Sequence, residues 1–192
     1  MSKDAVVPSR QRMRADARRN FDRIVAAAGT LIAEHGAEAS LEEIARRAEV
    51  GSATLHRHFP TRRALLEAVF EDRVKALCAK ADDLLTAPDP GEALFTWLRA
   101  VGAHAAANRG LGASLMRGGD PALGRTCHDM IINAGERLLA RARATDAVRP
   151  GIAVTHLLKL VGAISLATEQ EPDGPAEADR LLALAIDGVR PR

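Results

Sequence analysis

Residues 40–63 constrain the fold of this chain more than any other segment. They are Ser-Leu-Glu-Glu-Ile-Ala-Arg-Arg-Ala-Glu-Val-Gly-Ser-Ala-Thr-Leu-His-Arg-His-Phe-Pro-Thr-Arg-Arg. Ser40 and Glu43 form a capping box, which marks a helix start, and apolar residues follow at helical spacing. A turn at 49–51 and a second short helix at 52–58 come next, before a proline stops the helix. The segment predicts two short helices joined by a tight turn, with a basic start to a third.

Helical periodicity continues on both sides of this segment. It predicts a helix from about Asp16 to His35 before it and another from about Arg62 to Leu85 after it. No stretch alternates with period 2 for long enough to predict a strand. We therefore expect an all-α fold of about nine helices, the later ones near 91–107, 111–117, 120–144, 150–168 and 175–188.

The composition supports a helical, soluble protein. Apolar residues make up 47% of the chain but aromatic residues only 3%, so the core must be mainly alanine, leucine, valine and isoleucine. Cys78 and Cys127 lack CxxC spacing and are typical of small buried residues in a reducing compartment. No segment approaches the ~18 apolar residues of a membrane span, and residues 1–16 lack an apolar signal core. We expect a cytoplasmic protein with no membrane partner.

Positive charge is concentrated at the start of the chain. Residues 1–63 hold 12 Lys and Arg against 8 Asp and Glu, a balance of +4, whereas 15 against 17 gives −2 over residues 64–192. This asymmetry indicates that any polyanion-binding surface is local. Residues 1–15 carry four of the cations and predict a flexible basic arm. The arm either follows DNA phosphates or enters a minor groove, or it is an ordinary disordered terminus.

A short second helix, polar on one side and anchored by apolar residues on the other, suits the major groove of DNA. Several motifs resemble the DNA-binding domain of the TetR family of bacterial transcriptional regulators over residues 17–70. They are His-Gly at 35–36, Ser-Leu-Glu-Glu-Ile-Ala at 40–45, Ala-Thr-Leu-His-Arg-His-Phe at 53–59 and Pro-Thr-Arg-Arg-Ala-Leu-Leu at 60–66. Taken together with the predicted helices, this resemblance implies four segments. They are a basic arm at 1–15, a helix-turn-helix domain at 16–63, a connecting helix at 64–86 and a helical ligand-binding and dimerisation domain at 87–192.

The predicted DNA contacts cluster at the two short helices. Small residues at the start of the second helix allow close approach to base edges, and hydroxyls and cations suit phosphates and guanine. Ser40 serves as a cap, a phosphate contact or both, and His58 either braces the helix or touches the DNA backbone. Arg62 stands where the family usually has Lys and is expected to bind a phosphate. The full set is Ser40, Gly51, Ser52, Ala53, Thr54, His56, Arg57, His58 and Arg62.

Two positions depart from the family pattern. His56 replaces the usual Tyr, so its contact with DNA should weaken as rising pH removes the imidazole proton. Glu49 stands in the turn where Gly is common. An acid beside DNA is unfavourable unless it is paired, and Arg46 and Arg47 are the expected partners.

The last two predicted helices are apolar on more than one face, which requires burial on several sides. In a homodimer, the segments 151–166 and 181–186 of both copies would form a four-helix bundle across a two-fold axis. A two-fold dimer is also what the recognition of paired operator half-sites requires. The alternative is that both helices belong to the core of a single chain.

The second domain offers candidate residues for a small-molecule pocket. A few polar groups in an apolar, methionine-containing wall suit such a site, and His104 is the best polar candidate. Ordinary core packing is the alternative for each of these residues. The candidate lining is Trp97, Val101, His104, Met116, Cys127, Met130, Ile131 and Leu158.

The expected function is a dimeric DNA-binding regulator, in the first instance a repressor released from a palindromic operator by a small apolar ligand. Activation instead of repression stays open. A metalloenzyme or metal sensor is disfavoured because His104, Cys127, His128 and His156 show no HxxxH, HExxH or CxxC spacing. The sequence contains no GxSxG motif, and we do not expect an enzyme. We expect no metal and no cofactor. A structural helical scaffold without DNA binding is the remaining alternative.

Overall fold

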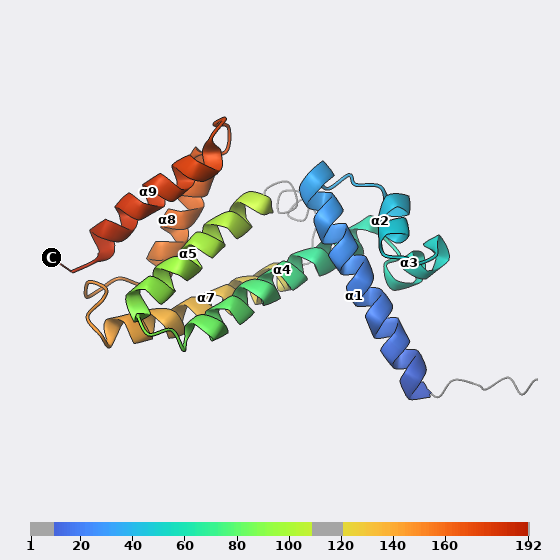
Figure 1. Ribbon diagram of the computed structural model, residues 1–192, viewed down its shortest axis with the longest axis horizontal. Coiled ribbons are helices and arrows are strands. Elements are labelled where there is room, and N and C mark those ends of the chain that lie inside the picture. Colours follow the sequence, from blue (N-terminus) through green and yellow to red (C-terminus); the bar gives the residue numbers. More distant parts are fainter. Residues whose placement is uncertain (1–9, 109–120, 192) are drawn as a thin grey trace, which may run out of the picture. The chain divides into compact units, whose positions relative to one another are not determined.

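The protein is all-α, as predicted. The computed structural model describes the backbone of residues 10–108 and 121–191 and the side chains of 14–108 and 124–191. Within these ranges it contains eight helices and no strand, and none of the helices is long and apolar enough to cross a lipid bilayer. The helices are α1 (Arg10–His35), α2 (Leu41–Arg47), α3 (Ser52–His58), α4 (Arg62–Leu84), α5 (Pro90–Ala107), α7 (Pro121–Arg143), α8 (Val154–Ala167) and α9 (Gly174–Val189) (Figure 1).

The first helix begins earlier than the sequence pattern predicts. α1 starts at Arg10 and not at about Asp16, so residues 10–15 of the expected flexible arm are helical. Arginine, glutamine, methionine and alanine favour helices even where no apolar face marks them. Ion pairs at helical spacing, including Arg18 with Asp22 at 3.1 Å, support the same helix. The rest of the expected arm and the helix expected near 111–117 lie outside the described residues.

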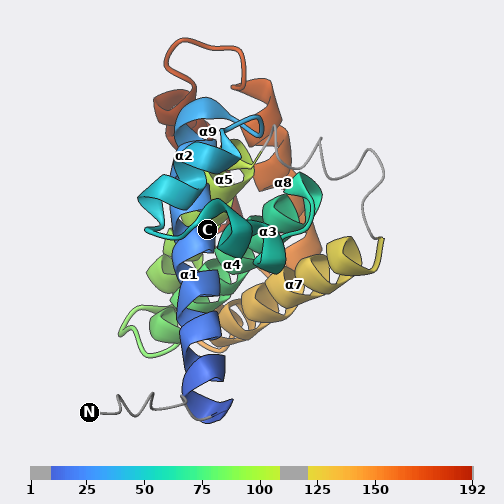
Figure 2. The same ribbon diagram turned by 90° about the vertical axis from the view of Figure 1, so that its right-hand side faces the viewer.

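The helices group into two compact units that divide between Val69 and Phe70, and α4 runs through both. The first unit contains α1, α2, α3 and the start of α4. In it, α2 packs against α1 and α3 against α2 (Figure 2). Its core is almost sealed from solvent and comprises Ile24, Ala28, Leu31, Ile44, Ala45, Leu55, Phe59, Leu65 and Val69.

The second unit is built around α5. This helix packs against α7, α8 and α9, and residues 93–95 and 97–98 are at most 3% exposed. The indole Nε1 of Trp97 donates a hydrogen bond to the carbonyl of Leu77 at 3.1 Å, which fixes α5 to the later part of α4. Gly135 of α7 lies against the same indole. The close packing of small and large residues around Trp97 defines the centre of this unit.

Candidate nucleic-acid interface

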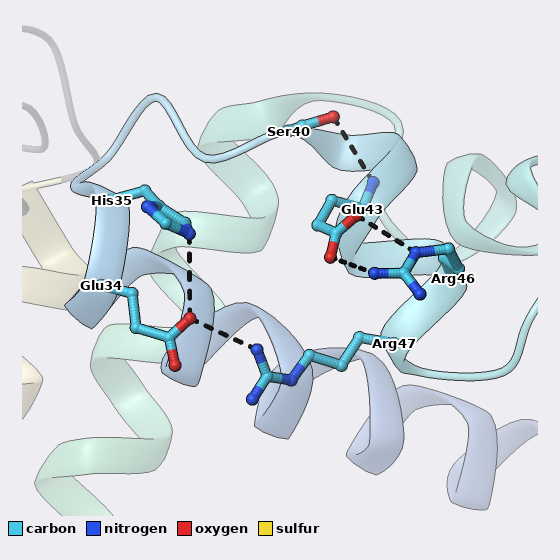
Figure 3. A network of polar contacts seen from close by, with 6 residues as sticks. All are labelled: Glu34, His35, Ser40, Glu43, Arg46 and Arg47. Atoms are coloured by element: carbon cyan, nitrogen blue, oxygen red, sulfur yellow. Dashed lines mark hydrogen bonds and ion pairs between the residues drawn. The ribbon is translucent and has the colours of Figure 1, made fainter.

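The start of α2 is held by a side-chain cap. The hydroxyl of Ser40 accepts a hydrogen bond from the backbone N–H of Glu43 at 3.4 Å, as the capping-box pattern predicts (Figure 3). The carboxylate of Glu43 does not complete the box as expected but accepts from Nε of Arg46 at 3.1 Å. A guanidinium one turn away is a stronger donor than a neutral amide. This hydrogen bond lowers the pKa of Glu43.

A second, exposed ion pair links α2 to α1. Nη1 of Arg47 lies 3.3 Å from Oε2 of Glu34, which His35 also approaches at 3.8 Å (Figure 3). Both arginines of α2 are therefore engaged with carboxylates on helices of the same unit. Neither pairs with Glu49, although the sequence analysis expected one of them to do so.

The turn between α2 and α3 has a Schellman geometry, in which two amides bond back to the last carbonyls of α2. Val50 N–H donates to Ala45 at 3.0 Å, and Glu49 N–H donates to Arg46 at 3.1 Å. Glu49 occupies the left-handed position with φ of 53°, which explains why glycine suits this place better. Its carboxylate faces Arg23 of α1, with Nη1 and Oε2 3.5 Å apart. Both side chains are exposed, so the pair adds little stability.

One face of α3 is exposed and consists of predicted contact residues. Leu55 is 1% exposed and anchors the helix, whereas the side chains of Ser52, Ala53, His56 and Arg57 face solvent. Thr54 is half-buried at the margin. A Cβ built on Gly51 would have no atom of the described residues within 4 Å, so their packing does not require glycine there. The open space at this position agrees with close approach by another molecule.

Two of the predicted contacts turn toward the protein. The ring of His58 packs edge-on against Phe21 of α1 with centroids 6.4 Å apart, and its Nε2 is buried with no hydrogen-bond partner among the described residues. Nη1 of Arg62 donates to the carbonyls of Ala37 at 3.0 Å and Ala39 at 2.7 Å. The sequence pattern did not distinguish these inward-facing residues from the exposed ones.

The residues predicted to line a ligand pocket are mostly in the core. Trp97 is fully buried and Val101 and Cys127 nearly so, while Met130, Ile131 and Leu158 are half-buried. Burial raises the pKa of the Cys127 thiol. Met116 lies outside the described residues. A role in ligand binding stays a prediction for this set.

His104 lies in a polar cluster that no sequence pattern indicated. Nη1 of Arg73 on α4 donates to Oδ1 of Asn108 at 2.7 Å, and Nδ2 of Asn108 lies 3.1 Å from Nδ1 of His104. Because a guanidinium only donates, the amide nitrogen must face the imidazole, whose Nδ1 is then the acceptor. Burial and then the charge of Arg73 lower the pKa of His104, which favours the neutral ring. Arg73 and Asn108 are 35 positions apart in sequence, so no local motif indicated their pairing.

Among the described residues of the second unit, two hollows larger than 100 Å³ lie between helices. A groove of about 380 Å³ between α4 and α5 is lined by Arg73, Lys80, His104 and Asn108 among small apolar residues. A pocket of about 130 Å³ lies between α5, α8 and α9. No group of three or more His, Cys, Asp or Glu residues suited to a metal ion occurs in the described part of the chain.

Family models match both parts of the chain. One, described as "Bacterial regulatory proteins, tetR family", matches residues 24–69, and another, described as "Transcriptional regulator SbtR-like, C-terminal domain", matches residues 89–191. A TetR transcriptional regulator from Streptomyces coelicolor is 39% identical, with 89% of this chain and 98% of that chain covered and a TM-score of 0.77. The chain belongs to the TetR family of bacterial transcriptional regulators.

Other solved structures extend the comparison. A TetR transcription regulatory protein from Mycobacterium vanbaalenii is 35% identical, with 93% of this chain and 99% of that chain covered and a TM-score of 0.75. The fold is shared with FadR from Bacillus subtilis in complex with stearoyl-CoA, at 18% identity, 88% and 100% coverage and a TM-score of 0.60. A comparison with curated proteins finds no match. In this TetR regulator, the DNA-binding match at 24–69 contains α2, the turn and α3.

The inward position of His58 leads to a prediction for this TetR regulator. We expect His58→Phe to leave DNA affinity within about two-fold and to raise the free energy of unfolding by about 1 kcal/mol, because it removes a buried nitrogen without a partner. Urea unfolding and fluorescence anisotropy with a labelled duplex measure the two effects. A tenfold loss of affinity in a variant of normal stability would instead assign His58 to the DNA contact.

Proposed function

We propose that the protein is a homodimeric repressor that binds a palindromic operator through α3 and is released by a small apolar ligand. The observation that carries this proposal is the exposed face of α3. Ser52, Ala53, His56 and Arg57 face solvent there, on a helix whose other face is anchored by the buried Leu55. A short, firmly held helix with small residues at its start and a guanidinium farther along suits the edges of bases in the major groove.

The exposed leucines of α8 and α9 support a homodimer. Leu166 on α8 is 71% exposed, Leu184 on α9 is 69% exposed, and Leu160 on α8 is 38% exposed. The same two helices bury Leu157, Val161, Leu182 and Ile186 inside their own chain. The alternative of core packing in a single chain therefore holds for one face of these helices, and the exposed leucines support the proposed dimer. Exposed leucines on two neighbouring helices suit a two-fold interface, in which each copy covers leucines of the other.

This interface gives a prediction. We expect Leu184→Glu to make the protein monomeric at micromolar concentration, because a two-fold axis would bring two copies of the new carboxylate into an apolar surface. Affinity for the operator should fall by about 100-fold or more, since one recognition helix replaces two linked ones. Multi-angle light scattering gives the mass, and Ala140→Glu, at an exposed position of α7, is the matched control. A dimeric Leu184→Glu variant would place the interface elsewhere.

The groove between α4 and α5 supports an effector site at His104. Its alanine-rich wall suits an apolar body, and the neutral ring of His104, with Asn108 and Arg73, suits one polar group on that body. The stearoyl-CoA complex of FadR is a precedent on this fold for a ligand that carries a long apolar chain. Because α4 runs from the second unit into the first, a ligand beside α4 has a covalent route to the helix-turn-helix.

The experiment begins with selection of duplexes from a random-sequence pool by the wild-type protein. We expect a palindromic consensus whose affinity falls steeply with salt, because arginines displace counterions from phosphates. A reporter behind the selected sequence then separates the two modes of regulation, since loss of the regulator raises expression under repression and lowers it under activation. No enriched sequence and no binding to duplex DNA at low salt would support a structural scaffold instead.

A further inference from the structure

Arg62 is the first residue of α4, and its side chain reaches back to the loop between α1 and α2. Nη1 donates to the carbonyl of Ala37 at 3.0 Å and to the carbonyl of Ala39 at 2.7 Å. The guanidinium is partly buried by these contacts. It thus joins two segments that are more than 20 positions apart in sequence.

The loop that Arg62 holds determines how the chain enters α2. Gly36 ends α1 in the left-handed region with φ of +78°, and a turn follows in which Ala39 N–H donates to Gly36 at 3.2 Å. Ala39 is 3% exposed, and its carbonyl belongs to the peptide that leads into Ser40, the cap of α2. A hydrogen bond to this carbonyl fixes the plane of that peptide and hence the direction in which α2 begins.

α2 depends on such anchors because it is only 7 residues long. An isolated helix of this length is unstable in water, so its orientation comes from its tertiary contacts. Ile44 and Ala45 anchor it in the core, Arg47 adds an exposed ion pair with Glu34, and Arg62 holds the loop at its start. α3 packs against α2 and is joined to it by the hydrogen-bonded Schellman turn. The direction of α2 is therefore passed on to α3.

We propose that Arg62 is a positioning residue that orients the α2–α3 pair for specific DNA through the 37–39 carbonyls. In this role it differs from the phosphate contact expected from the sequence, because its Nη1 is committed to the protein backbone. A misdirected α2–α3 pair keeps its charge but loses its fit to base edges. Specific affinity then depends on Arg62 more strongly than non-specific affinity does.

The test compares Arg62→Met and Arg62→Lys with the wild-type protein on two duplexes. One is the duplex selected from a random pool by the wild type, and the other has the same base composition in scrambled order. Affinities are measured by anisotropy between 50 and 300 mM KCl, well below the unfolding temperature of each variant. Arg62→Met removes the charge and the hydrogen bonds with little change of length, whereas Arg62→Lys keeps the charge on a shorter side chain.

Positioning predicts that Arg62→Met loses about tenfold or more in affinity for the selected duplex and about twofold or less for the scrambled one. The slope of log affinity against log salt should stay unchanged, and amides 37–43 should exchange hydrogen faster. A phosphate contact instead predicts equal losses on both duplexes and a slope smaller by about one per subunit. That result would overturn the proposal. Equal losses of affinity on both duplexes that are explained by a smaller folded fraction of the variant would also overturn it.

Arg62→Lys keeps the proposal testable if Arg62→Met does not fold. Its shorter side chain must move the loop or lose one of the two carbonyls. Positioning therefore predicts a loss of specificity between that of Arg62→Met and the wild type, with faster exchange of the same amides. Wild-type discrimination between the two duplexes together with unchanged exchange at 37–43 would show that charge alone is required, and would overturn the proposal.

Discussion

Arg57→Ala is expected to weaken specific DNA binding strongly at physiological salt while leaving the fold intact. Arg57 lies on the exposed face of α3, and its loss removes a guanidinium that can donate two hydrogen bonds to a guanine edge. Such a contact contributes about 1–3 kcal/mol, and a dimer makes it twice. Specific affinity should therefore fall by roughly 30-fold or more, as measured by anisotropy on the selected duplex. The unfolding midpoint should not change.

Arg137→Ala is the matched control for this prediction. Arg137 is also an exposed arginine, but it lies on α7 in the second unit and pairs with Asp82 at 2.5 Å. It lowers the net charge by the same amount, so a general electrostatic effect would weaken both variants equally. An Arg57→Ala protein that binds the selected duplex as tightly as Arg137→Ala would remove Arg57 from the DNA contact.

Gly135→Ala is expected to destabilise the second unit by about 2 kcal/mol, even though alanine is the better helix former. A Cβ at this position would lie 2.5 Å from Cγ2 of Val154 and 2.8 Å from two ring carbons of Trp97. The indole cannot move aside easily because it is fully buried and donates to the carbonyl of Leu77. Trp97 is the sole tryptophan of the chain, so its fluorescence during urea unfolding reports this core directly.

Gly124→Ala provides the opposite expectation on the same helix. A Cβ on Gly124 meets no atom of the described residues within 4 Å, so we expect only helix propensity to change and stability to rise by about 0.5–1 kcal/mol. Equal effects of the two substitutions would mean that the surroundings of Gly135 relax without cost.

The sequence predicted the helix-turn-helix in detail because its signals are local. Ser40 as a cap and the apolar spacing that anchors α2 and α3 depend on residues a few positions apart. The start of α1 was missed because its first turns are polar on every side and carry no periodic apolar face. The predicted partners of Glu49, Arg46 and Arg47, were also wrong, because Arg23 of another helix pairs with it.

The residues of a ligand site in the second unit were less predictable from the sequence. The pattern identified apolar helices, but it did not separate sealed core residues such as Trp97 from residues beside a groove such as His104. Core and pocket walls have the same composition, and only the arrangement of neighbouring helices decides which side chains face a hollow.

The sequence alone determined the all-α fold, the family and the exposed face of α3, because caps, turns and helical periodicity act over a few residues. The tertiary structure decided which of the candidate residues face inward. Within residues 40–63, His58 packs on Phe21 and Arg62 holds the carbonyls of Ala37 and Ala39. Both partners are far away in the chain. The direction of a long polar side chain depends on acceptors that only folding brings within reach.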